Sequence, residues 1–204
     1  MAIPITIIIG IFAVILSAYF SRRAWQINLI EEIRVRETDN CIQLLDIFSS
    51  TVDQRIAAQR FFISALVRGN PTDEDVKDYR EGVRLWLEKI NTIRSKIMFY
   101  FDYSDVMDFE RYIILRISQV GATCESAAAS YRSHGAITPE ELSKLRIASS
   151  TLDTVSARTF RMVYKLQTKV SKENFGTLRI VNDLTIYNNK YVSNLDIIRR
   201  ILNT

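Results

Sequence analysis

The feature that most constrains this chain is an uncharged run of 18 residues that extends from Ile3 to Phe20. Its only polar side-chain groups are those of Thr6 and Ser17 and the hydroxyl of Tyr19. As an α-helix this run would be about 27 Å long, which is close to the roughly 30 Å thickness of a bilayer's hydrocarbon core. We therefore predict a single N-terminal transmembrane helix.

A secretory signal that is cleaved off is the alternative interpretation of the same run. Such a signal has a basic start, a shorter apolar segment and a cleavage site of the small-x-small type. Here no Lys or Arg precedes the run, and Leu16-Ser17-Ala18 matches a cleavage site only in part. These features favour a retained anchor over residues 1–25, followed by a helical domain over residues 26–204.

The basic residues around the run predict its orientation. Nothing basic precedes it except the amino terminus, whereas Arg22, Arg23, Arg34 and Arg36 follow it. Positive charge is enriched on the cytoplasmic side of membrane helices. We therefore expect a single-pass protein whose helical domain lies in the cytoplasm.

One face of the predicted membrane helix carries small side chains. On a helical wheel Thr6, Gly10, Ala13 and Ser17 fall within about 60° of one another. Small residues let helix backbones approach closely in lipid, where packing drives association. The face is thus a candidate for helix packing or for the lining of a pore, although any apolar helix contains some small residues.

The remainder of the chain has the pattern of long amphipathic helices. The whole chain has six Gly and three Pro among 204 residues, so helix breakers are few. Apolar residues recur every three to four positions, Thr72 and Thr138 have the sequence context of N-caps, and Gly69 and Gly135 mark helix ends. We predict an all-α protein with a cytoplasmic bundle of four or five helices, whose last four elements begin near residues 72, 104, 138 and 178.

Recognisable catalytic signals are missing from the sequence. No glycine-rich nucleotide loop, no H-E-x-x-H and no C-x-x-C is present, and His134 precedes a glycine at an expected solvated helix end. An Arg separated from His134 by four to six intervening residues, as in ribonucleases of the HEPN class, is absent because residues 127–129 are alanines. Cys41 and Cys124 are far apart and are expected to be buried packing residues. We predict no enzyme activity, no catalytic residues, no metal and no cofactor.

Four acidic residues, Asp102, Asp105, Asp108 and Glu110, cluster around Ser104. In principle such a group binds a cation or acts in acid–base chemistry. Ser104 as an N-cap followed by acidic residues explains the cluster without either function. We therefore predict a capping role.

A row of cations is the strongest candidate for a contact surface. Arg158, Arg161, Lys165, Lys169 and Lys172 lie within about 80° of one another on a predicted helix. They could contact anionic lipid headgroups or an acidic partner, or form an ordinary solvated face. Nucleic acid is the weakest candidate, since no aromatic residues interleave to form a base-stacking platform.

Aromatic residues gather at the end of the second predicted element, in the sequence IMFYFDY of residues 97–103. Two packed helices cannot bury aromatic rings on every side of one of them. Phe99, Tyr100 and Phe101 are therefore either surrounded by the bundle or part of a subunit interface.

Two functional hypotheses follow. In the first, a membrane protein self-associates through its N-terminal helix and its bundle, as a homo-oligomeric tether or as a pore. In architecture and size this resembles small single-pass effectors of bacterial antiviral defence, such as the membrane accessory proteins of RNA-targeting CRISPR systems. The resemblance implies a membrane-perturbing role and a location in the bacterial inner membrane. In the second, a passive anchor holds an adaptor whose bundle docks a cytoplasmic protein partner.

Overall fold

The computed structural model describes the backbone of residues 5–172 and 175–176, and side chains from residue 9 onward within these ranges. The chain falls into two units, Met1–Asn40 and Cys41–Thr204. The predicted division at residue 25 concerns a membrane boundary, which this division by packing does not test.

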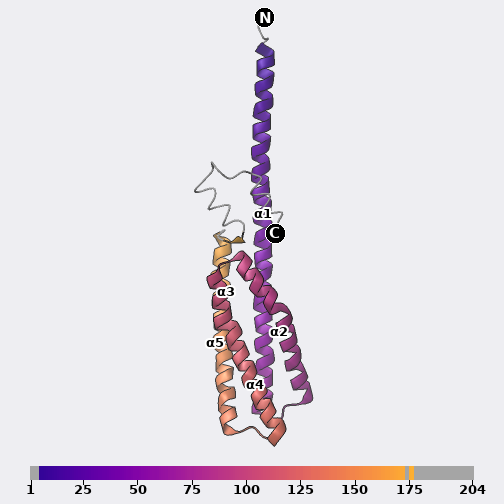
Figure 1. The fold of residues 1–204 in the computed structure, drawn as a ribbon, viewed down its shortest axis with the longest axis vertical. Coiled ribbons are helices and arrows are strands. Elements are labelled where there is room, and N and C mark those ends of the chain that lie inside the picture. The colour runs from indigo at the N-terminus through magenta and orange to yellow at the C-terminus, as the bar shows by residue number, and fades with distance from the viewer. Residues whose placement is uncertain (1–4, 173–174, 177–204) are drawn as a thin grey trace. The chain divides into compact units, whose positions relative to one another are not determined.

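The described part of the chain is helical and contains no strand. Its elements are α1 (Ile5–Val67), α2 (Asp73–Tyr100), α3 (Tyr103–Phe109), the π-helical turn η1 (Glu110–Ile114), α4 (Leu115–His134) and α5 (Pro139–Ser171). Figure 1 shows α2, α4 and α5 beside the second half of α1. The predicted all-α bundle is therefore confirmed, while the helix predicted to begin near residue 178 lies outside the described residues.

Helix ends lie close to where local sequence signals predicted them. Thr72 and Thr138 are N-caps that form capping boxes with Asp75 and Glu141 respectively. Gly135 ends α4 with a φ of 69°, a left-handed conformation that glycine adopts at low cost. The predicted N-cap at Ser104 is wrong, because the N-cap of α3 is Asp102, two residues earlier.

The second unit has a continuous apolar core. Its largest fully buried side chains include Phe48 and Leu66 of α1, Ile93 of α2, and Leu152 of α5. Phe48 meets Phe109 edge to face, with ring centroids 5.1 Å apart. Cys41 and Cys124 are both buried and form no disulfide with each other, which confirms the packing role predicted for them.

The amino-terminal part of the first unit exposes its large apolar side chains. The large apolar residues between Ile9 and Phe20 are 39% to 69% exposed. Of the predicted membrane run, side chains are described from Ile9 onward, and no helix within the described residues has both the length and the apolar character needed to cross a bilayer. The transmembrane helix has no support from this finding and stays a prediction.

The turn η1 interrupts the regular helix between α3 and α4. The N–H of Leu115 donates to the carbonyl of Glu110, five residues earlier, whereas a regular α-helix bonds residues four apart. Such single π-helical turns are often found at functional sites. This turn buries Ile113 and leaves Tyr112 exposed beside α5.

Candidate functional site

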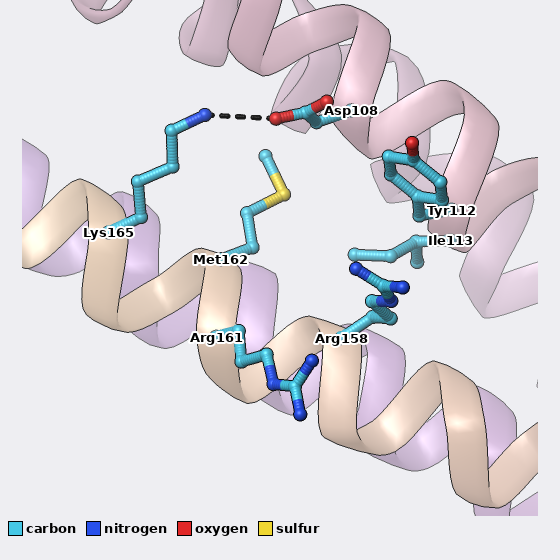
Figure 2. Close-up of a pocket in the computed structure, with 7 residues that line it drawn as sticks. All are labelled: Asp108, Tyr112, Ile113, Arg158, Arg161, Met162 and Lys165. Atoms are coloured by element: carbon cyan, nitrogen blue, oxygen red, sulfur yellow. Dashed lines mark hydrogen bonds and ion pairs between the residues drawn. The ribbon is translucent and has the colours of Figure 1, made fainter.

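A pocket of about 180 Å³ lies between α5 and the segment formed by α3 and η1. Its lining residues are Asp108, Tyr112, Ile113, Arg158, Arg161, Met162 and Lys165. Figure 2 shows Lys165 and Met162 directed toward Asp108, and the Arg158 guanidinium close to Tyr112 and Ile113. The pocket therefore combines an apolar floor, made by Ile113 and Met162, with a cationic wall on α5.

Lys165 connects this pocket to an ion-pair network between α3 and α5. Its Nζ lies 2.9 Å from Asp108 Oδ2 and 2.8 Å from Asp105 Oδ1. Lys169 Nζ, one helical turn further along α5, lies 2.6 Å from both Asp105 Oδ2 and Asp102 Oδ2. Two lysines of α5 thus share three carboxylates, those of Asp105 and Asp108 in α3 and of its N-cap Asp102.

Asp105 is the centre of this network because it is fully buried and pairs with both lysines. Burial by itself would raise the pKa of Asp105. The nearby ammonium groups of Lys165 and Lys169 and the hydrogen bond from the backbone N–H of Asp102 outweigh that effect and hold the pKa below its ordinary value. Asp105 is therefore ionised at neutral pH, and it holds α3 to α5.

Arg158 and Arg161 contribute positive charge at the pocket and are not part of this ion-pair network. The Arg158 guanidinium lies over the Tyr112 ring, 5.0 Å from its centroid. Arg161 lies at the pocket rim, and Figure 2 shows its guanidinium directed away from Tyr112. Within residues 5–172 and 175–176, neither arginine forms an ion pair with a carboxylate.

The predicted basic row is therefore not uniform. Lys165 and Lys169 form ion pairs inside the fold, so part of the row stabilises the bundle itself. Lys172 is exposed and follows the last residue of α5. The acidic cluster does contribute to capping, as predicted, since the backbone N–H of Asp102 donates to Asp105 Oδ2 at 3.1 Å. The sequence analysis did not predict the ion pairs that the acidic cluster forms with the lysines of α5.

The three aromatic residues proposed as a subunit interface have different surroundings. Phe101 is buried, Tyr100 is partly buried, and Phe99 is 51% exposed. Phe99 and Tyr100 meet edge to face, with centroids 4.9 Å apart. Phe101 therefore belongs to the core, and Phe99 is the member of the three with the most surface available for an interface.

The predicted small-residue face lies on the first unit. Gly10, Ala13 and Ser17 are exposed, and the side chain of Thr6 is outside the described ones. A Cβ added at Gly10 would meet no atom within 4 Å. The face is thus free to pack against another helix, and nothing in the described structure tests whether it does.

A buried polar cluster inside the second unit escaped the sequence analysis. Arg55 of α1 donates to the Tyr79 hydroxyl of α2 at 3.3 Å, and Gln59 donates to the carbonyl of Ile117 at 2.9 Å. The Tyr79 hydroxyl in turn lies 3.4 Å from the carbonyl of Gly121. The cluster joins α1, α2 and α4 through polar contacts in an otherwise apolar core.

Arg55 is unusual because it is a buried cation that has no ion pair with any described residue. Its Nε and Nη1 atoms have no hydrogen-bond partner, although its guanidinium lies 4.9 Å from the centroid of the Tyr79 ring. A sequence signal existed, since Phe48, Val52, Arg55 and Gln59 follow the three-to-four spacing of a core row. Two polar residues in such a row indicate a polar core contact.

Among the residues that the structure describes, no group of three or more His, Cys, Asp or Glu side chains has an arrangement that could hold a metal ion. Comparisons of the chain with protein-family models, with curated proteins and with solved structures found no match.

Proposed function

We propose that this chain is a membrane-anchored, self-associating helical protein that works by assembly and not by catalysis. The observation that supports it most directly is the exposure of every residue from Ile9 to Phe20. Contiguous apolar surface of this kind is costly in water and marks a surface that binds lipid or protein.

The sequence around this surface favours lipid as its surroundings. No charged residue falls between Ile3 and Phe20, and Arg22 and Arg23 follow immediately. Basic residues directly after an apolar run are typical of the cytoplasmic end of a membrane helix. Tyr19 and Trp25 occupy positions where interfacial aromatic residues are common. The proposal thus places the second unit in the cytoplasm.

Self-association is proposed through the face of Thr6, Gly10, Ala13 and Ser17. In lipid, apolar helices gain little from hydrophobicity when they pair, so close backbone packing across small residues becomes the main attraction. A dimer would form a tether, while a ring would place Thr6 and Ser17 hydroxyls around a pore. The ring is the form that would make the chain a membrane-perturbing effector of antiviral defence.

The test is the mass of the detergent-solubilised protein, measured by light scattering with correction for detergent. The full chain is compared with a chain that begins at Trp25 and with the variant Gly10→Leu. Phe12→Leu, on the opposite side of the helix, is the matched control. We expect a defined oligomer for the full chain and for Phe12→Leu, and a smaller species for the other two.

Two results would contradict parts of this proposal. An oligomer that persists without residues 1–24 would place the interface within residues 25–204, with exposed Phe99 as the first residue to substitute. A monomer in every case would reject self-association and favour the adaptor, in which a passive anchor holds a bundle that docks another protein.

A further inference from the structure

We propose that the pocket between η1 and α5 binds the phosphate-monoester group of a small ligand or lipid, held by Arg158 and Lys165, with Arg161 at the rim adding positive charge. The inference uses residues of the second unit alone and does not depend on whether the first unit enters a membrane.

The size of the pocket limits the ligand. Its volume is about 180 Å³. Pockets that enclose drug-sized molecules usually measure roughly 300–1,000 Å³. The pocket therefore suits a head group of a few heavy atoms, and the rest of the ligand would lie outside.

The charge of the pocket selects an anion. Three cationic side chains and one carboxylate, that of Asp108, line it. Lys165 is already paired with Asp105 and Asp108, whereas Arg158 and Arg161 form no ion pair with described residues. The Arg158 guanidinium, which has no carboxylate partner, favours a multi-oxygen anion because guanidinium matches phosphate oxygens in geometry as well as in charge, and Arg161 at the rim adds to the positive potential.

The local structure prepares the site for such a group. Arg158 lies over the Tyr112 ring, so its planar guanidinium loses less freedom when it binds. The buried side chains of Ile113 and Met162 give the pocket an apolar floor, and charge–charge interactions are stronger beside apolar groups than in bulk water. The π-helical turn η1 is what brings Tyr112 and Ile113 to this position, since both residues belong to it.

Asp108 acts against the ligand, and this gives the proposal its sharpest test. Its carboxylate repels an anion and holds Lys165 Nζ at 2.9 Å. Lys165 can leave Asp108 for a phosphate while it keeps its contact with Asp105 Oδ1 at 2.8 Å. Asp108→Asn should therefore strengthen phosphate binding, and a gain of affinity cannot result from misfolding.

The experiment is isothermal titration calorimetry of the full chain in a neutral detergent at low salt. The titrants are inorganic phosphate, dihexanoyl phosphatidic acid and, as a headgroup control, dihexanoyl phosphatidylcholine. The variants are Arg158→Gln, Asp108→Asn and the matched control Arg146→Gln, which removes one exposed cation from α5 at a distance of more than three helical turns from Arg158.

We expect saturable binding that Arg158→Gln weakens about tenfold, that Asp108→Asn strengthens severalfold, and that Arg146→Gln leaves unchanged. Binding of both phosphate and phosphatidic acid would identify a free phosphoryl group as sufficient, and binding of phosphatidic acid alone would identify a lipid headgroup. The proposal is overturned if neither binds, if phosphatidylcholine binds equally well, or if Arg158→Gln and Arg146→Gln weaken binding to the same extent.

Discussion

Substitution of Asp105 by Asn tests whether the ion-pair network holds α3 to α5. Asn has nearly the same size as Asp, so the change removes a charge without opening a cavity. In the native protein Asp105 is fully buried and pairs with Lys165 and Lys169 at 2.8 and 2.6 Å. The substitution leaves both ammonium groups near a neutral amide.

The size of the expected loss in stability depends on how exposed the two lysines are. Removal of one partner from a fully buried pair costs about 3–5 kcal/mol, whereas pairs on the surface contribute about 0–1 kcal/mol. The Lys165 side chain is 45% exposed and remains hydrated, and Lys169, 19% exposed, keeps Asp102 as a partner. An intermediate loss of about 2–3 kcal/mol in the free energy of unfolding is therefore expected at pH 7.

The pH dependence gives a second, independent signature. Because the pKa of Asp105 is lower in the folded protein, the unfolded state binds more protons as the pH falls toward about 4. The stabilisation is therefore complete above the unfolded pKa, and it is lost as the pH falls through the folded pKa. The difference between wild type and Asp105→Asn should shrink below about pH 4.

The assay is urea unfolding followed by circular dichroism, at pH 7 and at a series of acidic values. The matched control is Asp153→Asn, since Asp153 is 71% exposed and pairs with Arg60 between α5 and α1. We expect it to cost less than about 1 kcal/mol. The reasoning is refuted if Asp105→Asn lowers the free energy of unfolding no more than the control does at pH 7. It is also refuted if the difference in this free energy between the variant and the wild type stays constant as the pH falls.

Three further predictions concern the core of the second unit. Gly82→Ala should destabilise by about 1–3 kcal/mol in urea unfolding despite alanine's better helix propensity, because its Cβ would lie 2.6 Å from that of Ala58; an unchanged or increased stability would contradict this. Arg55→Met should leave the free energy of unfolding unchanged or raise it, since a buried charge without an ion pair is replaced by an apolar chain; a loss of more than about 1 kcal/mol would show that the tyrosine contacts compensate the charge. Cys124, whose pKa burial raises to about 12, should resist alkylation at pH 8 in the folded protein and react in urea, as followed by mass spectrometry.

The helices themselves were predictable because the signals that begin and end them are local. Thr72 and Thr138 each bond a residue three positions away, and the left-handed turn at Gly135 needs no distant partner. The all-α class follows from the spacing of apolar residues, and so does the burial of the apolar residues that α1 contributes to the second unit. Each of these features involves residues that are close in the sequence, so the sequence alone determines them.

The candidate site depended on the tertiary structure. Asp105 and Lys165 are sixty residues apart, and they meet because packing sets the register of α3 against α5. That register turns two members of the basic row into internal partners and leaves Arg158 over Tyr112. The same holds for Arg55, whose contact with Tyr79 exists because α2 packs beside α1. Periodicity shows which face of a helix a charge occupies, but the charge opposite it is decided by the packing of the neighbouring helix.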